Sequence, residues 1–321
     1  MILVLTHRRG FEADPVIDGL RSRGIPLFRF NAEYNSDQSG YALSISPTSH
    51  QFSLTCDGRV CCLGDVRAAW FQQPPPEPDH FAAMDPVRWR SSMITLNAFL
   101  DSLMCPWVNH FQAAQRAANK PIQLVAATRH GIRFPDSVIS NDPLTVRAFA
   151  AHHSPIVGKS VGAQWMQLND DLRVAYTKEI PKSWLQNDHD IAFAPVIYQK
   201  FFDRRRDFRV VMVGRQAFTA VCDTQTDDQK FDVRRDNDAN AYRLCEFPEE
   251  QINRLRSMMN DLNIDYCSAD FFETSSGEIL FVDLNVTGSW WWVDKLYRGE
   301  ICQALVSLLA RKAGYEQRKH S

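Results

Sequence analysis

The chain has 321 residues, of which 45% are hydrophobic and 23% charged, a composition typical of a folded protein with two or three lobes. Its formal net charge of -2 gives no general attraction for nucleic acid or for an anionic membrane. The sequence contains no apolar run near the roughly 20 residues of a membrane span, and its first basic residues follow the apolar ones, the reverse of a secretory signal. We therefore expect a cytoplasmic protein with no nucleic-acid partner and no membrane partner.

The cysteines are scattered and form no CxxC pair or Cys/His cluster. This spacing favours buried, reduced thiols over a metal site or a disulfide framework. The residues concerned are Cys56, Cys61, Cys62, Cys105, Cys222, Cys245, Cys267 and Cys302.

The first hundred residues predict an open α/β domain. Met1 to Thr6 is an apolar run of strand length, the next residues have helical spacing, and Ile25 to Phe30 is a second strand. This β-α-β unit lacks a GxGxxG motif, which argues against a dinucleotide. Further elements are expected in chain order: hairpin strands around Ala42 to Ile45, Gln51 to Thr55 and Val60 to Leu63, a strand at Ala68 to Phe71, a proline-rich loop at Gln73 to Asp79, a helix at Pro86 to Leu103 and a strand at Pro106 to Asn109.

The remaining two thirds alternate between helical and strand patterns. Three adjacent arginines, Arg204, Arg205 and Arg206, are expected in a solvated turn, and the polar segment from Asp223 to Asn240 in a mobile one. Helices are expected at Lys120 to Gly131, from Asn141 or Asp142 to His152, at Pro248 to Leu262 and at Gly299 to Ala313. Strands are expected at Ser137 to Ile139, Pro155 to Gly162, Leu172 to Glu179, Val196 to Phe202, Phe208 to Val213 and Gln216 to Asp223.

A predicted hairpin near the end of the chain carries three oxygen-bearing side chains. Its strands, Tyr266 to Phe272 and Ile279 to Leu284, flank a Ser-Ser-Gly turn. A two-residue loop of Ser276 and Gly277 would place Asp270 opposite Asp283, with Asn285 on the same face. Opposed carboxylates repel, so either one is protonated or a cation lies between them. Such oxygen ligands suit Mg²⁺, although a solvated acidic hairpin explains the pattern equally well.

The letters VGKS around Lys159 do not form a P-loop. The motif needs a glycine where the chain has His153, and no helix evidently follows Lys159. Lys159 is instead expected at the glycine-softened end of a strand. There its ammonium suits a phosphate, and Gly158 and Gly162 would let the backbone approach a ligand. An exposed strand-end lysine is the structural alternative.

Five segments, taken in order, resemble the ATP-grasp superfamily. The segments most similar to the microviridin-type (graspetide) peptide ligases, which are relatives of RimK-type ligases, are NKPIQLVAATRHGIRFPDS, YQKFFDRRRDFRVVMVGRQAF, KFDVRR and FVDLNVTGSWWWVDKL, together with the opening MILVLTHRRGFEADPVIDGLRSRG. The resemblance implies an N-terminal open α/β domain, 1–108, followed by two α+β lobes, 109–198 and 199–321, that hold ATP between them.

The resemblance also implies roles for individual residues. Lys120 and Lys159 would hold ATP phosphates, and the hinge would offer backbone groups to the adenine edge. Arg209 would reach the transferred phosphoryl group, although an ion pair with Asp207 is its alternative. The implied hinge residues are Gln199, Lys200 and Phe201; the implied ligands of one or two Mg²⁺ ions are Asp270, Asp283 and Asn285; the implied substrate contacts are Asp232, Arg234 and Arg235.

The implied activity is ATP-dependent ligation of a carboxylate to an amine or hydroxyl through an acyl phosphate, on side chains of a ribosomally made peptide. Two alternatives stay open: a RimK-like or glutathione-synthase-like ligase of amino acids or a small metabolite, and a nucleotide-binding partner without catalysis. Retention of the lysines and of the paired carboxylates argues against the second. Neither the acceptor nor homodimer formation follows from the sequence.

The chain departs from the family pattern just after the metal ligands. The related ligases usually have a glutamate followed by Ile-Asn-Pro, whereas this chain has Asp283, Leu284, Asn285 and Val286. Aspartate also binds Mg²⁺, but its side chain is one methylene shorter. The following run of Trp290, Trp291 and Trp292 favours core packing over a substrate clamp.

Overall fold

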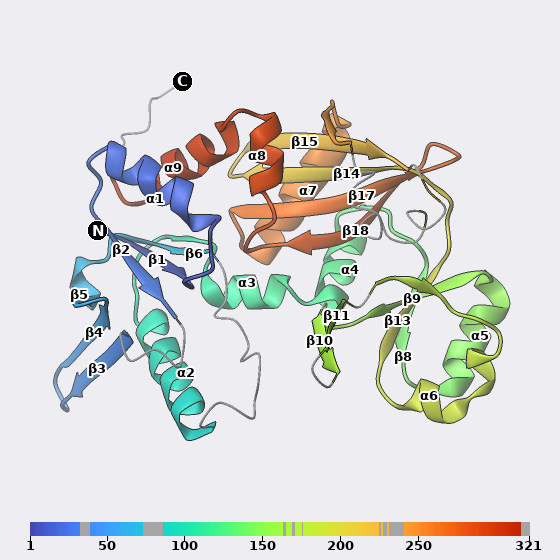
Figure 1. Ribbon diagram of the computed structural model, residues 1–321, viewed down its shortest axis with the longest axis horizontal. Coiled ribbons are helices and arrows are strands. Elements are labelled where there is room, and N and C mark those ends of the chain that lie inside the picture. Colours follow the sequence, from blue (N-terminus) through green and yellow to red (C-terminus); the bar gives the residue numbers. More distant parts are fainter. Residues whose placement is uncertain are drawn as a thin grey trace.

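The computed structural model describes residues 1–32, 39–72, 86–162, 165–168, 171–174, 176–224, 226, 230 and 241–315. Figure 1 shows an N-terminal part in blue, a central part in green and a C-terminal sheet in yellow to red. Among the described helices, none combines the length and the apolar character that crossing a membrane requires.

A parallel sheet with strand order β2-β1-β6-β7 forms the centre of the N-terminal part. Leu3 and Leu5 face the apolar cluster that includes helix α2 (Pro86–Asp101), whereas Ile2 and Val4 face the one that includes α1 (Ala13–Ser22). Both faces are therefore covered, which explains why these strands consist mostly of apolar residues. Their bounds are β1 (Ile2–Thr6), β2 (Leu27–Asn31), β6 (Ala68–Phe71) and β7 (Trp107–Val108), and the predicted β-α-β unit is confirmed.

A small antiparallel sheet, in the order β3-β4-β5, lies beside the parallel one. Its strands are β3 (Ser39–Ile45), β4 (His50–Cys56) and β5 (Arg59–Cys62), followed by the 3-10 helix η1 (Leu63–Asp65). Phe52 packs edge-on against Phe99 of α2. The predicted hairpins are confirmed, and the proline-rich stretch 73–79 lies outside the described residues.

The C-terminal sheet has the order β16-β15-β14-β17-β18 and is covered on both faces. Val210 and Met212 pack with helix α7 (Glu249–Leu262), whereas Val211 and Val213 pack with helix α9 (Glu300–Lys312). Side chains that alternate between the two faces of one strand thus pack against two different helices. The remaining bounds are β14 (Arg204–Val213), β15 (Gln216–Asp223), β16 (Arg243–Leu244), β17 (Tyr266–Thr274), β18 (Ile279–Asn285) and the short helix α8 (Trp291–Leu296).

Two helices connect the N-terminal and C-terminal parts: α3 (Phe111–Ala117) and α4 (Lys120–Arg129). Their apolar residues, such as Ala114 and Ala126, join the cluster shared with α2 and α7. Helix α4 begins where Asn119 accepts a hydrogen bond from the N–H of Ile122, at 3.1 Å. The sequence did not predict α3, whose seven residues are too few for a clear helical period.

The central part has a sheet with the order β12-β9-β13-β8 and a hydrophobic cluster of its own, built around Val146, Ile156 and Tyr198. The predicted strand from Leu172 to Glu179 is wrong: it falls in β11 and β12, which belong to different sheets. The bounds are β8 (Ser137–Ser140), α5 (Pro143–His153), β9 (Ile156–Ser160), β10 (Trp165–Leu168), β11 (Asp171–Val174), β12 (Lys178–Glu179), η3 (Trp184–Gln186), α6 (Asp188–Ala192) and β13 (Val196–Lys200).

The hydrophobic clusters divide the described residues unevenly. One cluster runs from the N-terminal sheet through α3 and α4 to the C-terminal sheet, and another joins α1 to α9, which lie side by side in Figure 1. The central part keeps its own small cluster. The boundaries at 108 and 198 remain a proposal, and this packing groups α3 and α4 with the larger body.

All eight cysteines are free of disulfide bonds in the structure. Most are buried or partly buried, and Cys62 is exposed. Burial raises the pKa of the Cys61 and Cys105 thiols to about 11, so these thiols stay protonated at neutral pH.

Candidate active site

The hairpin of β17 and β18 brings Asp270 directly opposite Asp283. The loop that joins the strands is longer than predicted, because Ser275, Ser276 and Gly277 all lie between them and the N–H of Thr274 donates to the carbonyl of Glu278. An irregularity of register between Asp270 and Phe271 offsets the extra residue. The predicted two-residue loop is therefore wrong, whereas the predicted pairing is confirmed.

Each of the two carboxylates lies beside a different basic side chain. The Nε of Arg209 is 2.9 Å from Oδ1 of Asp270, and the Nζ of Lys120 is 3.6 Å from Oδ2 of Asp283. These side chains are at most 29% exposed, so solvent screens the pairs only in part. Positive charge from two other elements, β14 and α4, thus offsets the repulsion between the carboxylates.

Arg209 does not form the alternative pair with Asp207. Asp207 is bound instead by Arg204, with 2.7 Å between Nη1 and Oδ1, and both side chains are 9% exposed. The second head-group contact of Arg209 is a hydrogen bond from Nη1 to the hydroxyl of Ser268, at 3.2 Å. Arg209 is therefore held on β14 so that it points to the acidic hairpin.

The donor set of the hairpin fits a hard divalent cation. Asn285 lies two residues after Asp283 and pairs with Ser268, so its side chain extends from the same face of β18. Two carboxylates and an amide oxygen suit Mg²⁺, which keeps several waters and also binds substrate phosphates. Among the described residues no group of three His, Cys, Asp or Glu side chains could hold a metal. A hairpin with two carboxylates leaves coordination positions for phosphate oxygens.

A separate pocket, which we call the interlobe pocket, lies between the central sheet and the C-terminal sheet. Its lining includes Lys159, Gln199, Lys200 and Phe201, four of the five residues expected to contact the nucleotide. Arg204 and Phe272 line its opposite side, where the guanidinium lies 4.4 Å from the ring centroid. Lys120 is not among the lining residues and lies instead at the hairpin.

The hinge residues are partly engaged inside the sheet. The Lys200 N–H donates to the carbonyl of Asp136 and the Phe201 N–H donates to that of Pro155. The buried Gln199 amide donates to Ser137 Oγ at 2.8 Å. These two N–H groups therefore already have acceptors, and the predicted contact with the adenine edge stays a prediction.

Gly158, beside Lys159, makes room for a neighbouring side chain. A Cβ at this position would lie 2.7 Å from Cδ1 of Ile180, so the missing side chain makes room for Ile180. The expected approach of a ligand to this backbone stays a prediction. Lys159, the next residue on β9, still lines the interlobe pocket.

The expectation of a solvated turn at Arg204, Arg205 and Arg206 is also wrong. The three residues begin β14, and Arg204 forms its buried pair with Asp207. Arg205 and Arg206 lie 2.9 Å and 2.6 Å from the two carboxylate oxygens of Glu273, which is 6% exposed. The acceptor thus comes from a strand 67 to 68 residues later in the chain, and a local sequence pattern does not predict such a contact.

A network that the sequence did not predict connects the N-terminal part to this site. The Glu12 carboxylate accepts hydrogen bonds from the backbone N–H groups of Ser289, Trp290 and Trp291, at 3.1 to 3.3 Å. Burial raises the pKa of Glu12, and these donors oppose the shift. Ser268, which binds Arg209, also donates to the Ser289 carbonyl at 3.1 Å. Glu12 therefore fixes the segment that follows Asn285.

The three tryptophans have different surroundings. Trp290 is 1% exposed and belongs to the core, as predicted. Trp291 is 36% exposed and packs edge-on against Phe11. Trp292 lies under the guanidinium of Arg209, 5.6 Å from it, and beside Tyr242. Core packing therefore describes Trp290 and the partly buried Trp292, which packs against the same cluster, but not the exposed Trp291.

The predicted substrate contacts Asp232, Arg234 and Arg235 lie outside the described residues, as does most of the segment from Asp223 to Asn240. Tyr242 follows directly. Burial raises the pKa of its phenol, and the charges of Asp207 and Asp270 add to the shift. The phenol is therefore neutral beside the acidic hairpin.

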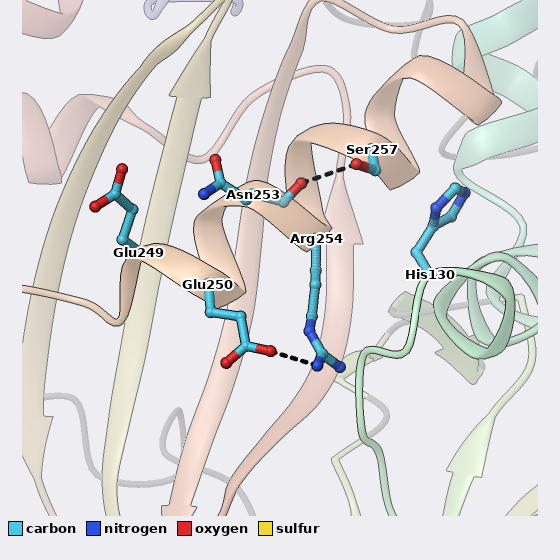
Figure 2. A pocket seen from close by; sticks show the side chains of 6 residues that line it. All are labelled: His130, Glu249, Glu250, Asn253, Arg254 and Ser257. Atoms are coloured by element: carbon cyan, nitrogen blue, oxygen red, sulfur yellow. Dashed lines mark hydrogen bonds and ion pairs between the residues drawn. The ribbon is translucent and has the colours of Figure 1, made fainter.

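Figure 2 shows another pocket, on the surface between helix α7 and the end of α4. Glu250 and Arg254 form an ion pair in it, and Arg254 also donates to the carbonyl of Gly131. The lining contains none of the residues expected at the nucleotide or the metal. Glu250 and Arg254 are already paired with each other, so we place the candidate site at the hairpin and the interlobe pocket.

No protein-family model and no curated protein matches the sequence. The structure is similar to a RiPP-associated ATP-grasp ligase of Chryseobacterium gregarium in complex with ADP and a leader and core peptide (TM-score 0.86, 21% identity, 97% of this chain and 96% of that one). It is also similar to the macrocyclase MdnC of Microcystis aeruginosa MRC bound to its precursor peptide MdnA (TM-score 0.83, 20% identity, 97% and 99%). A RimK-domain ATP-grasp protein of Sphaerobacter thermophilus is less similar (TM-score 0.57, 17% identity, 96% and 99%). The chain therefore has the ATP-grasp fold, and the predicted fold class is confirmed.

Proposed function

We propose that this protein is an ATP-dependent ligase that joins a carboxylate to an amine or hydroxyl, on side chains of a ribosomally made peptide. The observation that supports this most is the hairpin itself. Asp270 and Asp283 face each other, with Arg209 beside one and Lys120 beside the other. A module that only bound nucleotide would not need paired carboxylates with their own cationic partners.

ATP would lie in the interlobe pocket, with its phosphates directed to the hairpin. Lys159 would contact phosphates from the central lobe and Lys120 from helix α4. Gln199, Lys200 and Phe201 would line the adenine end. In this arrangement the phosphates would contact side chains from separate elements and not the glycine-rich helix N-terminus of a P-loop. Each lysine would supply a compact positive charge to the phosphates.

Mg²⁺ would be held by Asp270, Asp283 and Asn285, whose oxygen donors suit one or two ions. When bound, the metal neutralises charge on the phosphates and orients them. Lys120 and Arg209 lie next to these ligands, so the protein supplies positive charge on both sides of the carboxylate pair.

The reaction would proceed through an acyl phosphate. A carboxylate oxygen of the peptide attacks the γ-phosphorus of ATP, the bond to the bridging oxygen breaks, and ADP leaves. An amine or hydroxyl then attacks the acyl carbon, its proton is lost to solvent, and phosphate leaves. Positioning and charge neutralisation supply most of the catalysis in phosphoryl transfer. Arg209 suits the transferred group, because a guanidinium matches phosphoryl oxygens bidentately.

The comparison with solved structures favours a peptide over a free amino acid. Solved structures that are similar over nearly the whole chain include ligases bound to a leader and core peptide and to a precursor peptide, whereas the RimK-domain protein is less similar. Asp232, Arg234 and Arg235 are our proposed contacts to the peptide or its acyl phosphate.

The test is incubation with ATP, Mg²⁺ and a candidate precursor peptide encoded beside the gene. We expect ADP formation that depends on the peptide, and a peptide mass lower by one water for each bond. Amino acids offered in place of the peptide should give little ADP. ADP formation with amino acids alone would favour a RimK-like ligase, and no ADP formation with any acceptor would contradict the proposal.

A further inference from the structure

Gln123 is a buried glutamine that hydrogen-bonds the residue between two proposed metal ligands. Its side chain is 1% exposed. Its Oε1 accepts from the N–H of Leu284 at 3.1 Å, and its Nε2 donates to the carbonyl of Leu284 at 2.9 Å. The same Nε2 donates to the carbonyl of Ala117 at 2.8 Å. The amide therefore makes with Leu284 the two backbone hydrogen bonds that a residue of a neighbouring strand would make.

This contact falls at the outer edge of the C-terminal sheet, because β18 is the last strand in its order. Leu284 faces Ala269 of β17 on the inner side, and the helix side chain satisfies both of its outward backbone groups. Asp283 and Asn285 are the residues on either side of Leu284. Holding Leu284 thus fixes the direction in which both side chains leave the strand.

Gln123 also lies close to both members of the Lys120–Asp283 ion pair. It lies three residues after Lys120 on α4, so both side chains extend from one face of the helix. Lys120 reaches Asp283 while Gln123 binds the next residue of β18. The anchor at Ala117 ties the same amide to α3. These contacts therefore fix the position of helix α4 relative to strand β18.

We propose that Gln123 is a positioning residue that sets the metal affinity of the site by fixing Asp283 and Asn285 and their distance from Lys120. The inference rests on the proposed function, because it takes these two residues as metal ligands. Residues that orient metal ligands typically change metal affinity by about 10- to 100-fold when they are removed. A purely structural glutamine would affect stability alone.

The chain contains a matched control for that distinction. The Tyr297 hydroxyl accepts from the N–H of Thr219 at 2.8 Å and donates to its carbonyl at 3.0 Å, so it also binds both backbone groups of one strand residue. Thr219 lies on β15, two strands from β17. Tyr297→Phe removes an equivalent side-chain-to-strand contact without touching β18.

The experiment is a titration of the full-length protein with Mn²⁺ in the presence of ADP, with free metal followed by electron paramagnetic resonance. Mn²⁺ accepts the same oxygen ligands as Mg²⁺. Gln123→Met keeps the side-chain length and removes the amide. We expect the Kd for Mn²⁺ to rise about 10- to 100-fold, with the Kd for ADP alone unchanged. Tyr297→Phe should keep the wild-type Kd for Mn²⁺ even where its melting temperature falls.

Should Gln123→Met fail to fold, Gln123→Asn keeps an amide that is one methylene too short, and we expect its Kd for Mn²⁺ to rise as well. A wild-type Kd in a folded Gln123 variant would overturn the positioning role. So would an equal rise in Tyr297→Phe. Asp283→Asn separates the two proposals. If the wild-type protein binds no Mn²⁺, or if Asp283→Asn binds it with the wild-type Kd, the metal site itself is wrong. If Asp283→Asn loses Mn²⁺ binding while a folded Gln123 variant keeps the wild-type Kd, the Gln123 role alone is refuted.

Discussion

The ammonium of Lys120 lies 3.6 Å from a carboxylate oxygen of Asp283, although the two residues come from a helix after the N-terminal sheet and from the last strand of the C-terminal sheet. Their side chains are 20% and 16% exposed. One of them suits a phosphate and the other the cation that accompanies it. The pair therefore brings the proposed phosphate contact and the proposed metal ligand to one point.

Replacing Asp283 should stop the reaction while the fold persists. We expect Asp283→Ala to lower ADP formation on the order of 100-fold or more, because a metal ion provides several kcal/mol of charge stabilisation in such sites. Asp265→Ala is the matched control, since Asp265 pairs with Lys312 at the start of the same hairpin and away from the proposed ligands. ADP formation at the wild-type rate by Asp283→Ala would show that the metal assignment is wrong.

Lys159 should matter for nucleotide binding. Lys159→Ala removes an ammonium from the interlobe pocket, and a hydrogen bond to a charged group contributes about 1.5 to 3 kcal/mol. The Kd for ADP, measured by isothermal titration calorimetry, should rise about 10- to 100-fold. Lys178, an exposed lysine on the neighbouring strand β12, gives the control Lys178→Ala. Equal Kd values for the two variants would remove Lys159 from the site.

Glu12 should make the stability depend on pH in a defined direction. Burial raises the pKa of Glu12 above its ordinary value of 4.5, so the folded state holds a proton that the unfolded state releases. Its contribution to the free energy of unfolding is therefore largest in acid and is lost as pH rises through the raised pKa. Glu12→Gln cannot titrate. Urea denaturation of both proteins from pH near 4.5 to neutrality should show the wild type losing stability relative to the variant as pH rises. The opposite trend would mean that the three N–H donors outweigh burial.

Sequence patterns predicted the strands and helices well where one element is long and its neighbours are close in the chain. The Asp270–Asp283 pairing was predicted too, but from a loop that is one residue too short, and an irregularity in the hairpin restored the register. A single sequence does not reveal such an irregularity, because the extra residue has no distinctive chemistry. The prediction of this pairing was thus correct, but it lacked the irregularity that produces the pairing.

Contacts between distant segments could not be predicted from local patterns. The arginines from Arg204 to Arg206 look like a solvated run until Glu273 is placed beside them. Gln123 and Glu12 give no signal in the sequence, since a glutamine within a helix and a glutamate before one are usually exposed. The resemblance to a known superfamily suggested the proposed roles of Lys120 and Arg209, and the structure shows their partners, Asp283 and Asp270.

The N-cap of helix α4 should contribute measurably to the stability of the protein. Asn119 caps the helix through the N–H of Ile122, and loss of such a cap typically costs about 1 kcal/mol. We expect Asn119→Ala to lower the free energy of unfolding by about that amount, as measured by urea denaturation, whereas Asn119→Asp should retain the cap and stay within a few tenths of a kcal/mol. Equal stability of all three proteins would show that the cap contributes nothing.

The most direct test of the account is a crystal structure of the protein with ADP and Mg²⁺. We predict that the ion contacts Asp270 and Asp283 while the nucleotide lies in the pocket lined by Lys159 and Phe201. An ion bound elsewhere, or a nucleotide outside that pocket, would contradict the assignment of this site.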